Sequence, residues 1–383
     1  MDFEIPEEIR QLRDAVRRFV DREIRPLDEQ VREQDAIPID TISEARRRGV
    51  AAGFYGMYMP EDVGGGGLDL LSTVLLFEDI AGQGSRLARF ALGAHGGPTP
   101  VLLACNEEQK ERFLMPVMRF EKTNCFALTE PGAGSDAAAI QTTAVKDGDN
   151  YILNGVKHFI TNGPHADFAM VYAVTDKELG ARGGVTCFLV EKDTPGFSVA
   201  RIQKTMSGDD LQAELALEDC VVPASNILGE VGQGFLLAMQ WIGHGRVLMG
   251  AMCVGVADML LKMSTEYAKQ RVQFGKPIST KQAIQWMLAD TATEIYAARM
   301  MLYNAAWKAD KGENIIKETS MVKLYATEMV NRVADRALQI HGGMGYMREL
   351  PIERIFREVR VLRIVEGTSE IQRFIISRFL LNE

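Results

Sequence analysis

The chain has 383 residues, of which 46% are hydrophobic and 25% are charged, and its formal net charge is −9. This length allows two or three domains, and the composition is typical of a globular soluble protein and excludes wholesale disorder. The acidic balance, with no run of lysines and arginines, argues against nucleic-acid binding, although local basic groups can still bind an anionic substrate.

Membrane and metal chemistry are also not expected. Residues Met1–Glu4 lack the basic and apolar regions of a signal peptide, and the most apolar long segment, 235–261, is interrupted by His244, Arg246 and Asp258. The five cysteines are scattered without a Cys-x-x-Cys pair, and the five histidines lack ligand-like spacing. We therefore expect buried free thiols, no metal site, no membrane association and a cytoplasmic location.

The first expected domain, residues 1–122, is all helical. An apolar stripe predicts a first helix that begins after Pro6 and ends before Pro26. Three further features are expected: a loop at Gly64–Gly67, a helix over 70–81 and a helix that begins after Asn106.

The second expected domain, residues 123–232, consists of short strands. Runs bounded by Gly, Asp, Asn and Pro predict a small β sandwich or barrel, and Asp147-Gly148 predicts a hairpin turn. Strands and helices do not alternate, which disfavours a Rossmann unit. The expected strands are 125–129, 142–145, 151–154, 168–174, 186–190, 197–202 and 213–217.

The third expected domain, residues 233–383, is a helical bundle. Helical periodicity is continuous over 234–268, 280–311, 315–340 and 369–381, and lengths near thirty residues are typical of a bundle. The fold class is therefore α+β: an N-terminal helical domain, a middle β sandwich or barrel, and a C-terminal four-helix bundle.

A candidate base lies near the end of the chain. Glu366 is expected in the turn before an amphipathic helix, with Thr368 or Ser369 as the N-cap. Ile364 and Val365 flank the carboxylate and would desolvate it, which would raise its pKa and make it a better base. By itself the pattern fits a simple partner of the helix dipole equally well.

Four other segments leave a strand or helix with glycines or polar groups. Glycines let the backbone approach a ligand closely, and successive N–H groups can bind phosphate or carbonyl oxygens. Each segment alone also fits an ordinary turn, sheet edge, helix connector or C-cap, and Ser135 lacks the Gly-x-Ser-x-Gly frame of a hydrolase nucleophile. The segments are Phe126–Asp136, Lys157–Gly163, Arg271–Pro277 and Gln339–Tyr346.

Taken in order and spacing, these five segments resemble the acyl-CoA dehydrogenase family. The most specific matches are Thr-Glu-Pro-Gly-Ala-Gly-Ser-Asp at 129–136 and Glu-Gly-Thr-Ser-Glu-Ile-Gln-Arg at 366–373. The resemblance covers essentially the whole chain. It implies FAD bound between the β domain and the C-terminal bundle, an acyl-CoA substrate, an electron-transfer flavoprotein as partner, a role in fatty-acid β-oxidation, and a homotetramer built as a dimer of dimers.

The resemblance also implies the residues that bind the cofactor. Phe126 and Phe159 depart from the tyrosine and tryptophan common at these positions, so each keeps an apolar face and loses a polar group. The implied set is Phe126, Leu128, Thr129, Gly134 and Ser135 at the flavin and the thioester end of the substrate; Phe159 and Thr161 at the flavin ring; Arg271, Phe274, Gln282, Gln339, Gly342 and Gly343 at the pyrophosphate and adenine, partly across a subunit interface; and Thr368 and Glu370 at the flavin cleft.

The resemblance makes Glu366 the base that removes the α-proton while the β-hydrogen leaves as hydride. The backbone N–H of Glu366 and a ribityl hydroxyl would stabilise the developing enolate. Some branches of the family place the base immediately before the residue that matches Arg246, but Gly245 cannot act as a base, which favours Glu366. Ser135 and Arg246 are expected to contact substrate, with Arg246 anchoring the base region, and His244 fits either a substrate contact or a core histidine.

Other functions on the same fold stay open. An acyl-CoA oxidase or an enoyl-CoA reductase would keep the same motifs. A flavin monooxygenase would lack the base, and a non-catalytic scaffold would not need it. Gly243 and Gly245 remove side-chain bulk where the acyl chain should enter, which suits a branched, cyclic, or short to medium acyl group.

Overall fold

The structure, a computed structural model, describes residues 4–382; the expected absence of a signal peptide therefore concerns residues that lie, except Glu4, outside the described part. The chain divides into two compact units. We call residues 4–33, 68–89 and 243–382 the helical unit, and residues 34–67 and 90–242 the sheet unit. The predicted division of the sequence at residues 122 and 232 stays a prediction.

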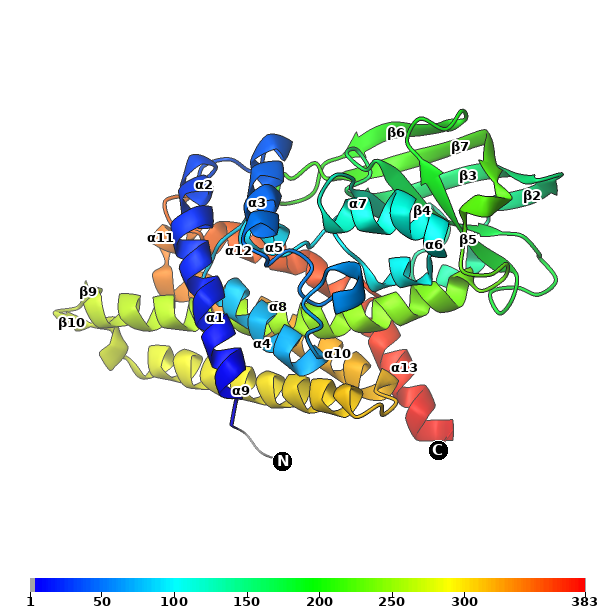
Figure 1. Ribbon diagram of the computed structural model, residues 1–383. Coiled ribbons are helices and arrows are strands. Elements are labelled where there is room, and N and C mark those ends of the chain that lie inside the picture. The colour runs from blue at the N-terminus through cyan, green and yellow to red at the C-terminus, as the bar shows by residue number, and fades with distance from the viewer. Residues whose placement is uncertain (1–3, 383) are drawn as a thin grey trace. The chain divides into compact units, whose positions relative to one another are not determined.

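Long helices dominate the helical unit (Figure 1), and the expected helices 234–268, 280–311, 315–340 and 369–381 are all found. Helix α10 packs against α9, α12 and α13, and α4 packs against α1 and α9. The helices of this unit are α1 (Glu7–Phe19), α2 (Arg25–Gln30), α4 (Leu70–Gly82), the part of α8 (Gly234–Gln270) from residue 243, α9 (Gln282–Asp310), α10 (Ile316–His341), α11 (Gly343–Tyr346), α12 (Ile352–Val359) and α13 (Ser369–Asn382).

Helix α8 is long and apolar enough to cross a membrane by length and composition, but 61% of its most apolar window is buried inside the protein. Within the helical unit, Val247, Ala251 and Val254 of α8 are fully buried. This burial is typical of the core helix of a globular protein.

The first α-helix, α1, ends at Phe19 and so before Pro26, as predicted, but the helical backbone does not stop there. A π-helical turn, Val20–Ile24, follows α1 directly, and α2 then begins at Arg25 with Pro26 in its first turn. Proline is tolerated in the first turn of a helix because its missing N–H would have no intrahelical partner there. The wider turn lets the chain continue in the same direction through the proline.

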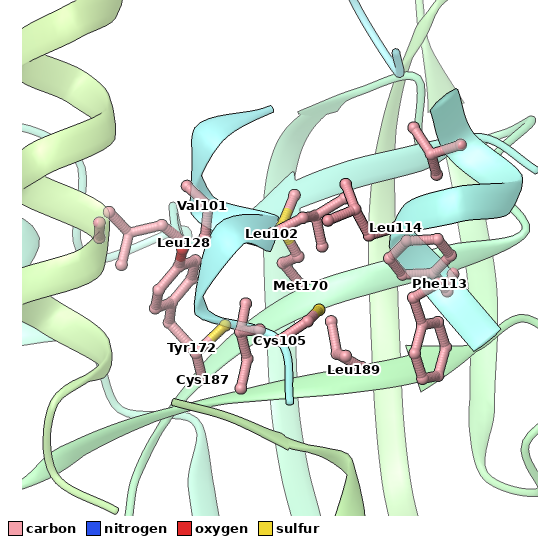
Figure 2. Packing of buried hydrophobic residues seen from close by; sticks show 14 of the residues in the cluster. Val101, Leu102, Cys105, Phe113, Leu114, Leu128, Met170, Tyr172, Cys187 and Leu189 are labelled. Carbon is pink, nitrogen blue, oxygen red and sulfur yellow. The ribbon is translucent and has the colours of Figure 1, made fainter. Parts of the chain in front are cut away.

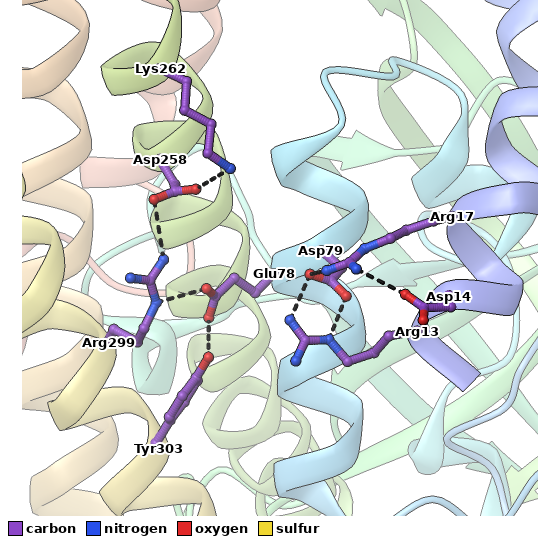
Figure 3. Close-up of polar contacts among 9 residues, drawn as sticks. All are labelled: Arg13, Asp14, Arg17, Glu78, Asp79, Asp258, Lys262, Arg299 and Tyr303. Carbon is purple, nitrogen blue, oxygen red and sulfur yellow. Dashed lines mark hydrogen bonds and ion pairs between the residues drawn. The ribbon is translucent and has the colours of Figure 1, made fainter. Parts of the chain in front are cut away.

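Polar contacts tie α4 to two neighbouring elements in the helical unit (Figure 3). Asp79 accepts hydrogen bonds from Arg13 and Arg17 of α1, whereas the adjacent Glu78 accepts from Arg299 Nε (2.8 Å) and Tyr303 Oη (2.9 Å) of α9. Consecutive residues of a helix point in directions about 100° apart, so one turn of α4 contacts both helices.

The sheet unit is built on a sheet in the strand order β6-β7-β3-β2-β4-β5-β8, with β1 paired to β4 in parallel. The strands β2 and β4 join through a single pair, Thr143 and Val174. The sheet therefore has two halves, which enclose one core, as in the predicted sandwich or barrel. The strands are β1 (Asn124–Ala127), β2 (Thr143–Asp147), β3 (Asn150–Thr161), β4 (Phe168–Val174), β5 (Val185–Glu191), β6 (Phe197–Gln203), β7 (Gln212–Pro223) and β8 (Ile227–Leu228).

Both faces of β4 are buried, and its side chains alternate between two cores. Ala169 and Val171 belong to the core between the halves of the sheet. Met170 and Tyr172 point the other way and pack with Leu102 and other residues of short helical segments (Figure 2). The segments that contribute to this core include the 3-10 helix Pro100–Ala104, the π-helical turn Lys110–Leu114 and α7 (Met115–Met118). The sheet unit also contains α3 (Ile39–Ala51) and α6 (Glu107–Gln109).

Most local predictions in the sheet unit and at its borders are confirmed. Asn106 forms a capping box with Gln109 at the start of α6, and Asp69 caps α4 after the Gly64–Gly67 loop. The five cysteines are free and buried. The prediction of a strand over 151–154 was too short, because β3 continues through Lys157 to Thr161 and pairs with β7.

Candidate active site

Glu366 lies in a strained turn immediately before α13. Its φ angle is +59°, and that of Gly367 is +87°. A glutamate in the left-handed region is uncommon, costs on the order of 1 kcal/mol, and persists only where the surrounding structure holds it. Residues held in such conformations cluster at functional sites.

Three side chains hold this turn through its backbone carbonyls. The carbonyl of Glu366 accepts from Arg246 Nε (3.0 Å) and Gln372 Nε2 (3.1 Å). The carbonyl of Gly367 accepts from Lys323 Nζ (2.7 Å) and from the same Gln372 nitrogen (2.9 Å). Gln372 and Lys323 are fully buried, so these hydrogen bonds are made out of contact with water.

Thr368 is the N-cap of α13, as one of the two sequence predictions proposed. Its Oγ1 accepts from the backbone N–H of Ile371 (3.3 Å). Ser369, the alternative, instead donates to Glu328 of α10 (2.7 Å). The cap and this link to α10 define where the turn ends and the helix begins.

The carboxyl of Glu366 is poorly solvated. Its Oε2 is buried and has no hydrogen-bond partner in the described part of the chain. Burial raises the pKa of this carboxyl to about 7, although the charges of Arg246 and Lys323 act in the opposite direction. The predicted rise of the pKa is thus supported.

The predicted cause of that rise was wrong. Ile364 and Val365 are 52% and 39% exposed, so these sequence neighbours do not enclose the carboxylate. The enclosing element is α8: a Cβ atom on Gly245 would lie 2.7 Å from Oε2 of Glu366 and 2.9 Å from Oε1. The prediction from Ile364 and Val365 therefore had the correct direction for the pKa of Glu366, but α8 and not these two residues lies against the carboxylate.

The other predicted residues on α8 have different surroundings. Arg246 is buried, and its bond to the Glu366 carbonyl confirms that it anchors the base region; contact with substrate stays a prediction. Burial lowers the pKa of His244 to about 4, so this imidazole is neutral near pH 7. An ideal Cβ on Gly243 would meet no atom within 4 Å, whereas the space beside Gly245 is filled by the Glu366 carboxylate. The expectation that Gly245 leaves room for the acyl chain was therefore wrong, and for Gly243 it stays a prediction.

In the sheet unit, two of the predicted cofactor segments are joined directly. The backbone N–H of His158 donates to the carbonyl of Thr129 (2.8 Å). Behind this contact, Lys157 Nζ donates to Glu130 Oε1 (2.7 Å) and to the carbonyls of Leu128 and Tyr172. Each of the two predicted segments therefore supplies one member of a buried ion pair.

Glu130 belongs to the scaffold of the first segment. It also accepts from the backbone N–H groups of Gln141 (2.6 Å) and Thr142 (3.0 Å). Burial alone would raise the pKa of this carboxyl, but Lys157 and these N–H donors outweigh burial and hold the pKa below its usual value. Glu130 is therefore ionised and fixes the loop that follows β1.

Phe159 projects from the second segment. Its side chain is 61% exposed and its φ angle is +58°. The amide side chain of Gln203 holds this backbone, because its Oε1 accepts the Phe159 N–H (3.0 Å) while its Nε2 lies 3.2 Å from His158 Nε2. His158 Nδ1 in turn contacts Glu214 (2.8 Å). The network holds the strained backbone of Phe159, which presents an exposed aromatic ring, and such a ring suits a surface that receives a planar ligand.

The remaining predicted positions of the sheet unit differ in what their side chains can contact. Phe126 is half-buried, with its ring centroid 4.8 Å from that of Tyr172, and Leu128 packs into the core. Gly134 and Ser135 are exposed, and Thr161 is half-buried at the end of β3. A cofactor contact of Leu128 would therefore use its backbone.

In the helical unit, the predicted pyrophosphate and adenine residues gather at the ends of helices. Tyr267 stacks on His341 (centroids 4.3 Å apart), which places the end of α8 beside the end of α10. The residues in question are all exposed: Arg271 and Phe274 on the hairpin β9–β10 (Val272–Gln273 and Lys276–Pro277), Gln282 at the start of α9, and Gln339, Gly342 and Gly343 at the end of α10. Gly342 also caps α10 with φ +57°, and Glu370 is exposed in the first turn of α13.

Comparisons with known proteins decide the family. The models of the acyl-CoA dehydrogenase N-terminal, middle and C-terminal domains match residues 6–121, 125–220 and 232–381. A 3-(aryl)acrylate reductase of Clostridium sporogenes is 41% identical over 97% of both chains. The chain belongs to the acyl-CoA dehydrogenase family.

Members of the acyl-CoA dehydrogenase family are FAD-dependent oxidoreductases. A subunit of the caffeyl-CoA reductase–Etf complex of Acetobacterium woodii is 40% identical and covers 98% of this chain and 99% of its own. The butyryl-CoA dehydrogenase structure from Megasphaera elsdenii has a TM-score of 0.88 at 36% identity, with both chains covered completely. The relatives thus include both dehydrogenases and reductases.

The residues present fit FAD and the family's chemistry in two respects. The exposed ring of Phe159 projects from one of the two joined segments that the resemblance assigns to the flavin. The buried Oε2 of Glu366 has no partner among the described residues, as expected of an oxygen that meets a substrate proton. The individual cofactor contacts stay predictions.

Three functional candidates had no assigned role in the sequence analysis: Lys323, Gln372 and the pair Lys157–Glu130. A signal for Lys323 exists, because it lies on the apolar face of α10 four residues after Thr319 and seven before Val330, all buried. A lysine at such a position needs a partner. The sequence alone does not identify that partner, which is the carbonyl of Gly367 in the turn before α13.

Proposed function

We propose that the protein interconverts an acyl-CoA thioester and its trans-2-enoyl-CoA, with Glu366 as the group that moves the α-proton. The observation that carries this proposal is the buried Oε2 of Glu366, which has no partner in the described part of the chain and is presented by a strained turn. A carboxyl with a raised pKa is a stronger base than an exposed one, and polar groups with strongly shifted pKa values are typical of functional sites.

In the oxidative direction, the carboxylate of Glu366 accepts the α-proton of the thioester. FAD, when bound, supplies the acceptor for the hydride that leaves the β-carbon. The carbonyls of Glu366 and Gly367 stay bound to Arg246, Lys323 and Gln372, so the carboxylate is held in place rather than recruited by a loop movement. Preorganisation of this kind lowers the entropy cost of the proton transfer.

The partners follow from the relatives. One relative is named as part of a complex with Etf, and we propose an electron-transfer flavoprotein as the electron partner. A homotetramer is proposed on the family resemblance, and a cytoplasmic location on the scattered free cysteines. A role in fatty-acid β-oxidation would apply if the oxidative direction operates.

An anaerobic titration of the purified flavoprotein with acyl-CoA esters tests this function. The panel contains linear short-, medium- and long-chain esters, a branched ester, a cyclic ester and 3-phenylpropionyl-CoA. We expect one class to bleach the flavin absorbance. If FAD is bound and no ester bleaches it, oxidation of the esters in this panel is ruled out. A preference for linear long chains would contradict the acyl class expected from Gly243. Absence of flavin would favour a scaffold.

A second candidate is the reverse reaction, the reduction of an α,β-unsaturated acyl-CoA. The names of two relatives, a 3-(aryl)acrylate reductase and a caffeyl-CoA reductase complex, favour it. A carboxyl with a pKa near 7 can donate a proton in this direction as readily as it accepts one in the other. Photoreduced enzyme mixed anaerobically with cinnamoyl-CoA should regain the oxidised flavin spectrum, and reoxidation by oxygen but not by any enoyl ester would argue for oxidase or monooxygenase chemistry.

A further inference from the structure

Lys323 is a buried lysine directly behind the turn that carries Glu366. Its side chain projects from the middle of α10 and is 0% exposed. Its Nζ donates to the carbonyl of Gly367 at 2.7 Å. Fully buried lysines are rare because the ammonium must leave water, so a lysine kept in this position needs compensating groups.

The charged and titratable groups around Lys323 come from three elements. Burial lowers the pKa of Lys323 to about 8, and Arg246 of α8 acts in the same direction. Cys253 of α8, Glu328 of α10 and Glu366 act in the opposite direction. The ammonium is therefore protonated at pH 7.

These neighbours leave Glu366 as the acid that Lys323 can influence most directly in the described part of the chain. Burial raises the pKa of Cys253 to about 12, which keeps the thiol neutral. Glu328 already accepts from Arg363 (2.9 Å) and Ser369 (2.7 Å). His244, next to Gly245 on α8, is neutral near pH 7 because burial lowers its pKa to about 4.

Arg246 and Lys323 hold the turn in different ways. Arg246 bonds the carbonyl of Glu366, whereas Lys323 bonds the carbonyl of Gly367, the residue with φ +87°. Gln372 bonds both carbonyls without carrying a charge. The turn therefore has one neutral clamp and two cationic ones.

We propose that Lys323 is a positioning residue for the carboxyl of Glu366: its ammonium fixes the Gly367 carbonyl, which holds the left-handed turn, and its positive charge favours the carboxylate over the acid. The inference rests on the proposed function of Glu366. Lys323 contacts the backbone of the turn and does not touch the reacting atoms. Its effect on proton transfer is exerted through Glu366.

The direct test is an infrared pH titration of the oxidised, FAD-loaded protein without substrate. The carboxylic-acid stretch of Glu366 is assigned by its loss in Glu366→Gln. In Lys323→Met, we expect the titration midpoint of this band to rise by on the order of one pH unit, because a nearby positive charge is removed. In Lys323→Arg, which keeps the charge, the midpoint should stay near that of the unmodified protein.

One variant separates the charge of Lys323 from the hydrogen bonds that hold the turn, and a second serves as a control. Gln372→Met removes the neutral clamp, and we expect slower flavin reduction with an unchanged carboxyl midpoint. Lys262→Met removes a lysine of α8 whose side chain is 74% exposed, and neither quantity should change. If Lys323→Met does not fold, Lys323→Gln, which keeps a donor and removes the charge, should still shift the midpoint.

An unchanged midpoint in both Lys323→Met and Lys323→Gln would overturn the electrostatic part of the proposal. An unchanged rate of flavin reduction in Lys323→Met well above the midpoint would overturn the positioning part. Failure of the proposed function is seen separately: if Glu366→Gln still reduces the flavin at a normal rate, Glu366 is not the base, whereas the infrared midpoint continues to report what Lys323 does to its charge.

Discussion

The carboxylate of Glu366 occupies the space that a side chain on Gly245 would need. An ideal Cβ on Gly245 would lie 2.7 Å from Oε2 and 3.0 Å from the carboxyl carbon. Real Cβ atoms do not approach other atoms so closely, so a glutamate at 366 in this position requires glycine at 245. The two positions, 121 residues apart in the chain, therefore share one volume, and only one of them can place a carboxylate there.

Gly245→Ala should displace the carboxylate without harming the fold. Alanine in a helix interior is more favourable than glycine by about 0.5–1 kcal/mol, and the clash is with the end of a flexible side chain, so the melting temperature should stay level or rise. Misplacement of a base by about 1 Å can cost on the order of 10²-fold in rate. Stopped-flow flavin reduction and thermal melting of the same preparation give both quantities. Gly243→Ala is the matched control for thermal melting, because its new Cβ meets no protein atom within 4 Å. Its rate reports instead on the expected entrance of the acyl chain.

The shared volume also predicts that the base can be moved. Glu366→Gly should abolish α-proton removal, and glycine should relieve the backbone strain at φ +59°. Adding Gly245→Glu would return a carboxylate to the same volume from α8. We expect the double variant to reduce its flavin at least tenfold faster than Glu366→Gly alone. A double variant no faster than the single one would contradict the view that the carboxylate's location is sufficient.

Periodicity and turn chemistry predicted most of the elements. The long helices and the strands of the sheet unit are found where apolar spacing placed them, because each buries one face or two against a continuous core. Pro26 did not end the helical backbone, because its own missing N–H would have no intrahelical partner in the first turn of α2, which follows the π-helical turn Val20–Ile24. The helix α11 was not predicted because four residues are too few for a periodic signal, whereas α12 has buried apolar residues at helical spacing, Ile352, Ile355 and Val359, which the sequence analysis overlooked.

The site was predicted through its motif and not through its surroundings. Glu366 was identified, but the groups that set its charge, Arg246 excepted, were missed. Lys323 and Gly245 reach it from other helices, and such contacts follow from helix packing rather than from local sequence. The same holds for Lys157 and Glu130, which stand in two recognised segments yet pair across 27 residues.

Glu366→Gln should lose activity and gain stability. Removal of a general base typically costs about 10²–10⁴-fold in rate, with FAD retained because the turn keeps its backbone contacts.

The stability of the same variant should depend on pH. In the native state the pKa of Glu366 is raised from 4.5 to about 7, so between these pH values the residue binds more protons in the folded state than in the unfolded state. Its contribution to the free energy of unfolding therefore falls as the pH rises through that window. The variant should therefore be more stable than the unmodified protein at pH 8, by on the order of 2 kcal/mol, and the gap should narrow toward pH 5. Denaturant melts at the two pH values measure it; an equal gap at both would refute the assignment.

The pH dependence of the reaction should have opposite signs in the two directions. α-Proton removal needs the carboxylate, so the rate of flavin reduction should rise tenfold per pH unit below about pH 7 and level off above it. Reduction of an enoyl-CoA needs the carboxylic acid, and its rate should be level below about pH 7 and fall above it. Stopped-flow traces with an ester and its enoyl partner provide the comparison, and parallel profiles would mean that another group limits both.

Breaking the buried pair Lys157–Glu130 should loosen both segments assigned to the flavin. Lys157→Met leaves Glu130 charged and buried beside the carbonyls that the ammonium had bonded, and removal of one partner of a buried pair typically costs about 3–5 kcal/mol. We expect a lower melting temperature and a lower ratio of flavin to protein, measured from absorbance after gel filtration.

Lys192→Met is the matched control in the same unit. The side chain of Lys192 is 55% exposed and pairs with Asp167, so its loss should lower the free energy of unfolding by less than about 1 kcal/mol. The double variant Lys157→Met, Glu130→Gln removes the uncompensated charge and should be more stable than Lys157→Met alone. If Lys157→Met kept full flavin occupancy and the melting temperature of the control, the pair would not hold the two segments together.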